Sequence, residues 1–166
     1  MNTRTLSRFR LFGKAGRLVM TVLSIVAALI TVFCGLAAAY VARLPEAAPA
    51  EYNAKKLVAV FVLAELFAAS AAGALWMLRG LFAVLTRCDS PFCGDVVARL
   101  RSFGFSLLPV AVFASASDTL TGRFLSAGKG GVSIQWGILL AFVVTMALVA
   151  VFRYGVQLQK ESDETL

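Results

Sequence analysis

Residues able to carry out catalysis or to bind a metal are scarce in this chain. The sequence contains no histidine and three cysteines, Cys34, Cys88 and Cys93. Histidine is the usual acid–base group near neutral pH and the most frequent metal ligand, so its absence excludes histidine triads and histidine-bound zinc. Three cysteines, one of them inside an apolar run, do not complete a four-cysteine zinc site. We therefore expect a protein that is not an enzyme and that holds neither a metal nor a cofactor.

Cys88 and Cys93 belong to a polar stretch, CDSPFCGDVVARLR, which lies between two apolar segments. Four residues separate the two cysteines, which rules out a C-x-x-C redox motif. The stretch instead predicts the start of a helix, because an Asp-Ser pair can cap it, Pro91 suits its first turn and Asp95 places negative charge at its N-terminal end. Apolar residues at helical spacing then indicate one buried face, formed by Val96, Val97, Leu100, Phe103 and Leu107.

Two carboxylates, Glu65 and Asp118, fall inside long apolar segments. A charge at the centre of a bilayer costs about 2.5 to 3.5 kcal/mol, so Glu65 must be protonated, paired or hydrated. It is either a proton or cation site, or a neutral carboxyl that hydrogen-bonds a serine or threonine of another span. We favour the second interpretation, because the apolar segments hold no basic residue and no second central acid. Asp118 lies near the end of its segment, where Arg123 or water can satisfy it.

The composition indicates that lipid surrounds most of the chain. Of 166 residues, 60% are hydrophobic and 15% are charged, and the mean hydropathy is +0.84. A soluble domain of this size cannot cover so much apolar surface. The net charge of +7 is scattered between uncharged runs rather than clustered on one face, so we expect no direct binding of nucleic acid.

Four apolar segments are long enough to cross a bilayer as helices, which takes about 17 to 25 residues each. The third is the least apolar, because it contains Pro109 and Asp118. Pro109 is expected to free the carbonyl of Phe105, with Ser106 as the nearest hydroxyl able to donate to it. Residues 1–166 are thus predicted to form a single all-α integral membrane domain. It is a four-helix bundle with spans near 18–42, 57–78, 103–120 and 132–152.

Lysine and arginine are unevenly divided between the segments that flank the spans, and such residues stay preferentially in the cytoplasm. Eleven of the sixteen lie before the first span, between spans two and three, or after the fourth, and five lie in the other two loops. Both termini are therefore predicted to be cytoplasmic, in the inner membrane of a bacterium. The cytoplasmic parts are a basic N-terminal segment, a loop with a helix start, and a tail, at residues 1–17, 79–102 and 153–166.

The N-terminal segment has competing interpretations. The first apolar run is longer than the roughly 7 to 15 apolar residues of a signal peptide, so we expect it to be retained as a span. Ahead of it, Leu6, Phe9, Leu11 and Phe12 stand among basic residues, which suits a helix lying on an anionic leaflet. A plain positive-inside flank explains the same residues equally well.

Small residues recur at helical spacing in three spans and predict close packing of helices. They indicate a compact bundle rather than helices separated by lipid. The stripes are Ala64, Ala68 and Ala72 with Ala69 and Gly73 in span two, Gly35 and Ala39 in span one, and Gly137 and Ala141 in span four.

Two short motifs resemble those of a known family. In the loop, PFCGDVVARLR carries a Pro-Phe pair, an acid and an Arg-Leu-Arg run, and at the C-terminus FRYGVQLQKESDETL carries a glycine, a leucine-polar pair and an acidic end. Their order around four spans resembles the bacterial membrane family catalogued as domain of unknown function 2975. Cys93, Gly94 and Val96 depart from the family's pattern, which usually has serine or threonine, an acid, and asparagine at these places.

The resemblance implies a regulatory role. Family members are often encoded beside small helix-turn-helix regulators, which suggests a non-enzymatic membrane protein that docks or sequesters such a DNA-binding regulator in the cytoplasm. The acidic tail either faces the regulator's basic surface or is simply solvated. The candidate partner-binding residues are Pro91, Phe92, Asp95, Arg99, Arg101, Tyr154, Gly155, Leu158, Glu161, Asp163 and Glu164.

A second hypothesis is a small transporter or channel subunit that uses the intramembrane Glu65. It would act as a homo-oligomer, because one four-helix bundle encloses little space. A membrane enzyme ranks last, since Glu65 and Asp118 are the only acids in the spans.

Overall fold

The chain folds into four long helices. The computed structural model describes residues 3–43, 54–87, 93–125 and 131–164. The helices are α1 (Thr3–Ala42), α2 (Ala54–Leu85), α3 (Gly94–Leu125) and α4 (Trp136–Glu164), and the described ranges contain no strand. Each helix is long and apolar enough to cross a membrane. The predicted all-α fold with four spans is confirmed.

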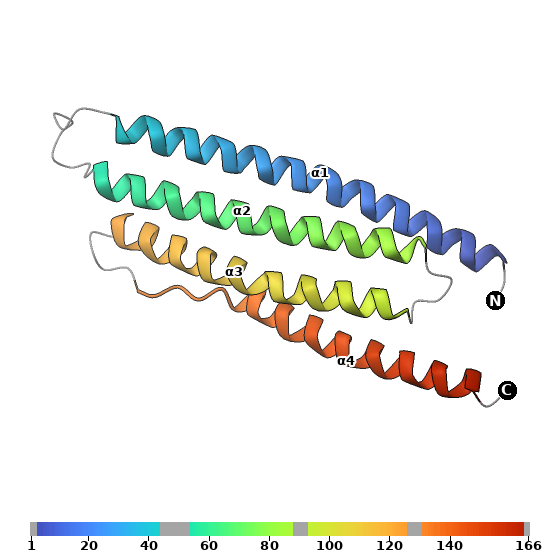
Figure 1. The fold of residues 1–166 in the computed structure, drawn as a ribbon. Coiled ribbons are helices and arrows are strands. Elements are labelled where there is room, and N and C mark those ends of the chain that lie inside the picture. The colour runs from blue at the N-terminus through green and yellow to red at the C-terminus, as the bar shows by residue number, and fades with distance from the viewer. Residues whose placement is uncertain (1–2, 44–53, 88–92, 126–130, 165–166) are drawn as a thin grey trace.

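The helices lie side by side in an open row (Figure 1). Each packs against its neighbour in sequence, and within the described part of the chain no other pair of helices is in contact. The two outer helices, α1 and α4, therefore have one neighbour each. This arrangement is more open than the compact bundle expected from the small residues.

The two ends of the row differ in the number of their described basic side chains. At one end α1 and α3 begin and α2 and α4 end; we call it the basic end. At the other, which we call the opposite end, the described side chains include three basic residues, Arg43, Lys56 and Arg123. The described basic side chains at the basic end are Lys14, Arg17, Arg79, Arg87, Arg99, Arg101, Arg153 and Lys160.

All four helices extend beyond their predicted spans at the basic end, and α1 and α4 extend the farthest. α1 begins at Thr3 and runs without interruption to Ala42, so the basic N-terminal segment continues the first span and is not a separate helix lying on the membrane. α4 runs on to Glu164, well past the predicted limit of the fourth span at residue 152. At 1.5 Å per residue α4 is roughly 44 Å long, which exceeds the hydrocarbon thickness of about 30 Å.

Glycines mark the closest approaches of α1 to α2. A Cβ built at Gly13 would lie 2.6 Å from Cγ2 of Thr86, and one built at Gly16 would lie 2.6 Å from ring atoms of Phe82. Gly35 faces α2 in the same way farther along the helix. Only glycine permits such contacts, so these positions set the distance between the two helices.

The small residues predicted to form packing stripes divide into two groups. Ala68 is buried and Gly35 lies against α2. Ala39, Ala69 and Ala141 are exposed, and Gly73 and Gly137 have no heavy atom within 4 Å of the place of a Cβ. The prediction of close packing was wrong for this second group. In a row of helices, at least one face of each helix has no neighbouring helix against it.

The apolar core lies toward the basic end, where α2, α3 and α4 meet. Leu81, Val96, Leu100 and Val149 are buried together, and Cys93 and Phe152 pack against them. Val96 and Leu100 belong to the face predicted for the start of the third helix, so the buried side is confirmed. The helix begins at Gly94 with Asp95 in its first turn, whereas the predicted Asp-Ser cap and Pro91 fall outside the described residues. This cluster fixes the basic ends of three helices relative to one another.

Helix α3 continues on both sides of Pro109. The hydroxyl of Ser106 donates to the carbonyl oxygen of Phe103 at 2.6 Å, rather than to that of Phe105 as expected. Before the proline, α3 approaches α4 at Gly104, where a Cβ would lie 3.2 Å from Sδ of Met146. The aromatic rings of Phe105 and Phe142 add a tilted contact with centroids 6.3 Å apart.

Candidate functional site

Glu65 lies half-buried where α2 contacts α1, and its carboxyl faces Gly35. A Cβ at Gly35 would lie 3.1 Å from Oε1 of Glu65, so the glycine leaves the space that the carboxyl occupies. Among the described residues, Glu65 forms neither a hydrogen bond nor an ion pair.

The hydrogen bond expected between Glu65 and a hydroxyl of another span is not formed. Thr31 Oγ1 donates to the carbonyl oxygen of Ala27 at 3.0 Å, and Ser70 Oγ donates to that of Phe67 at 2.8 Å. Serine and threonine hydroxyls in helices commonly bond to their own preceding turn, which uses the one donor of each hydroxyl and leaves its oxygen able only to accept.

Asp118 has a partner that the sequence did not indicate. Its carboxylate accepts a hydrogen bond from the side-chain amide of Gln135, rather than pairing with Arg123. The backbone N–H of Gln135 donates to Ser115 Oγ at 3.2 Å, and that of Ser133 donates to Thr119 Oγ1 at 3.0 Å. The polar residues of α3 therefore hold an adjoining segment of the chain.

That segment is the beginning of the predicted fourth span. Residues 131–135 are not helical, and α4 begins at Trp136 rather than at Val132. Backbone groups outside a helix need other partners in an apolar environment, and α3 supplies them. The signal in the sequence was the spacing of Ser115, Asp118 and Thr119, which places all three on one face of α3.

Arginines at the basic end lie over aromatic rings rather than beside carboxylates. The guanidinium carbon of Arg79 is 4.4 Å from the ring centroid of Trp76, and that of Arg101 is 5.8 Å from that of Phe105. The Nε atom of Arg79 is buried without a hydrogen-bond partner. Such stacking holds a cation in place while leaving most of its donors free.

The described members of the predicted partner-binding set lie at one end of the row. Pro91 and Phe92 fall outside the described residues, as does the side chain of Asp163. The packing of α3 against α4 brings the two groups of predicted residues to the same end, although Gly155 is half-buried. The exposed members are Asp95, Arg99 and Arg101 at the start of α3, and Tyr154, Leu158, Glu161 and Glu164 on α4.

Side chains of the α4 tail also interact within the helix. Gln157 Nε2 donates to Glu161 Oε1 at 3.1 Å, and Lys160 Nζ lies 3.8 Å from Glu164 Oε1. Both are contacts between residues four apart in sequence. Such contacts stabilise a helix where it has no neighbouring helix to pack against. Tyr154 and Leu158 share the same four-residue spacing and are 63% and 47% exposed.

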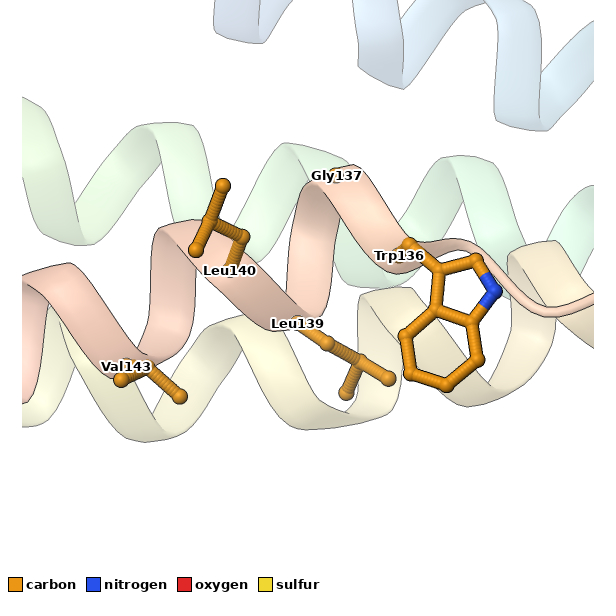
Figure 2. A pocket seen from close by; sticks show the side chains of 5 residues that line it. All are labelled: Trp136, Gly137, Leu139, Leu140 and Val143. Carbon is orange, nitrogen blue, oxygen red and sulfur yellow. The ribbon is translucent and has the colours of Figure 1, made fainter.

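Two hollows in the surface are lined by apolar residues and so lack polar groups for binding or catalysis. One, of about 450 Å³, lies along α4 at Trp136, Gly137, Leu139, Leu140 and Val143, and Figure 2 shows these side chains spreading from a single helix. The other, of about 490 Å³, lies along α1 between residues 26 and 36. Each is lined by one helix and is apolar, as expected of surface that contacts acyl chains. The described residues contain no group of three potential metal ligands.

Four membrane-length helices in a row, with their polar groups at the two ends and one carboxyl between α1 and α2, define a multi-pass membrane protein. Comparison of the chain with known protein families, with characterised proteins and with solved structures finds no match of any of the three kinds. Function must therefore be argued from the residues themselves.

Proposed function

We propose that this chain is a non-enzymatic, multi-pass protein of a bacterial inner membrane that docks a cytoplasmic DNA-binding regulator at its basic end. The observation that carries the proposal is the tail of α4. It remains helical to Glu164, and its base is anchored by Val149 and Phe152 in the apolar cluster. A helix fixed in this way presents side chains to a soluble partner in a constant position.

The orientation rests on charge. Eight described basic side chains lie at the basic end and three at the opposite end. Because lysine and arginine in short flanking segments resist translocation, the basic end is the cytoplasmic one. The α4 tail, the start of α1 and the start of α3 then face the same compartment.

The docking surface that we propose is the exposed side of the tail around Tyr154 and Leu158. An aromatic and an aliphatic side chain one turn apart form the kind of anchor that dominates protein interfaces. Glu161 and Glu164 follow on the same helix, and acidic groups there complement the basic surface with which a regulator binds DNA. The helix-turn-helix class of the partner is inferred from the resemblance of the two motifs.

The test is recovery of the partner after crosslinking in cells. The full chain and a version truncated after Phe152 are purified from crosslinked membranes, and soluble proteins are identified by mass spectrometry. We expect one helix-turn-helix regulator with the full chain and at least a tenfold smaller yield with the truncated chain at equal membrane levels. Equal recovery of such a regulator by both chains, or its absence from both, contradicts the proposal.

A second candidate function, a small transporter or channel subunit, is favoured by Glu65. Its carboxyl lies at the contact of α1 and α2 and has no hydrogen-bond or ion-pair partner among the described residues. Ionisable groups inside membranes commonly mark proton or cation pathways. The open row encloses no pore by itself, so this function requires a homo-oligomer.

Flux in liposomes separates the two functions. If Glu65 carries protons or cations, Glu65→Gln abolishes flux, because the amide no longer exchanges a proton or holds a charge. Asp118→Asn is the matched control, since Asp118 already accepts from Gln135 and its amide keeps flux intact. Identical flux from the Glu65→Gln and native chains eliminates this second candidate.

A further inference from the structure

Two arginines from neighbouring helices lie against residues on one face of α2. The guanidinium carbon of Arg79 lies 4.4 Å from the ring centroid of Trp76. From α3, Nη1 of Arg99 comes within 3.5 Å of where a Cβ on Gly80 would be. Trp76 and Gly80 are four residues apart and so occupy adjacent turns of the same face. Because Gly80 has no side chain, Arg99 of α3 can lie against α2 at this position.

Neither cation is neutralised by the described part of the chain. Within the described residues, Arg79 and Arg99 form no ion pair with a carboxylate, and Nε of Arg79 is buried without a hydrogen-bond partner. Two guanidinium groups on adjacent turns repel each other, and an anion between them relieves that repulsion while satisfying the free N–H donors.

The depth of the pair identifies the anion. Arg79 is the first charged residue after the uncharged run 66–78 of α2 and lies six residues before the end of that helix. Trp76, 59% exposed, is of the type that concentrates at headgroup level. Phosphates of phospholipids lie at this depth. Arginine matches phosphate with paired N–H donors, and basic pockets between helices on the cytoplasmic side are typical sites for anionic headgroups.

The same face of α2 also has room for an acyl chain. Toward the middle of the membrane, Trp76 is followed by Gly73 and then Ala69, each on the same side of the helix. Gly73 has open space around the place of a Cβ, and Ala69 is exposed. The exposed Leu66 and Met77 border this narrow strip.

We propose that Arg79, Arg99 and Trp76 form a binding site for the phosphate of an anionic phospholipid, with an acyl chain along Gly73 and Ala69. The lipid lies between α2 and α3 at the basic end and ties the two helices together. This site is independent of the docking surface on α4, because none of its residues belongs to the tail.

The test is a lipid titration of the full chain in mild detergent, with bound lipid counted by native mass spectrometry. We expect phosphatidylglycerol to bind at least tenfold more tightly than phosphatidylcholine. Arg79→Gln and Arg99→Gln should each weaken phosphatidylglycerol binding about fivefold, the effect of one basic residue at a membrane surface. Arg101→Gln is the matched control, because it removes the same charge from α3 at a guanidinium that lies over Phe105. It should change binding less than twofold.

Three outcomes would contradict the proposed lipid site. Equal binding of the two lipids, or equal losses from Arg99→Gln and Arg101→Gln, overturns the site. Displacement of phosphatidylglycerol by an equal concentration of inorganic phosphate overturns the assignment to lipid. Arg99 is exposed, so Arg99→Gln keeps the test valid even where thermal unfolding shows that Arg79→Gln disturbs the fold.

Discussion

The two ends of the helix row use their polar residues in contrasting ways. At the opposite end, Asp118 and Thr119 of α3 accept hydrogen bonds from the segment that precedes α4. At the basic end, Arg79 and Arg99 are without carboxylate partners within the described chain, and Leu158 is exposed on a helical tail. Polar groups at one end complete the fold, whereas those at the other remain available to lipids and proteins.

The same contrast separates the two carboxylates inside the helices. Asp118 accepts from Gln135, so it has a structural role. Glu65 lies against Gly35 and has no hydrogen-bond or ion-pair partner among the described residues. A residue that is costly to place in a membrane and is not used by the fold is a candidate for function.

The largest effect is expected for Gly16→Val at the basic end. A Cβ at this position would lie 2.6 Å from the ring of Phe82, and overpacking of this kind costs about 1 to 3 kcal/mol. We predict a loss of about 2 kcal/mol in the free energy of unfolding in bicelles. Gly137→Val is the control, because nothing lies within 4 Å of that Cβ position. Equal losses from the two changes would show that α1 does not approach α2 at Gly16.

A smaller effect is expected for Leu158→Glu in the α4 tail. The change places a charge on the proposed docking surface, where loss of an anchor residue costs more than about 1 kcal/mol. Recovery of the regulator after crosslinking should fall about tenfold, while thermal unfolding stays unchanged because Leu158 lies outside the apolar cluster. Unchanged recovery of the regulator would mean that the α4 tail does not contact it.

The smallest effect is expected for Thr119→Val at the opposite end. It removes the acceptor for the backbone N–H of Ser133 and keeps the size of the side chain. Polar contacts between membrane helices average about 0.6 kcal/mol, and we predict a loss of that size. Recovery of the regulator after crosslinking should remain at the native level. A clear reduction in that recovery would show that the opposite end also affects partner binding.

Much of the fold could be predicted from the sequence, because long apolar segments and their basic flanks leave few alternatives. The buried face at the start of α3 was also predictable from the spacing of Val96 and Leu100. The start of α4 was not, since it depends on hydrogen bonds between Gln135 and residues 17 and 20 positions earlier. The small residues indicated packing, but only contacts between helices distinguish Gly35, which faces Glu65, from Gly73, which faces open space.

The candidate site was predicted in part. Arg99 was singled out by its place in a motif, whereas Arg79 and Trp76 were not, because their stacking and the unpartnered Nε are visible only in three dimensions. The absence of a partner for Glu65 was likewise unpredictable, since it depends on where the hydroxyls of α1 and α2 donate.

Photocrosslinking at matched positions on the two ends tests the central claim most directly. Leu158 and Ile134 are 47% and 46% exposed, so a photoreactive amino acid at either position is equally accessible. The account predicts that, in living cells, position 158 captures a cytoplasmic DNA-binding regulator and position 134 captures none. Capture of the same proteins from both positions, or of no DNA-binding protein from position 158, would contradict it.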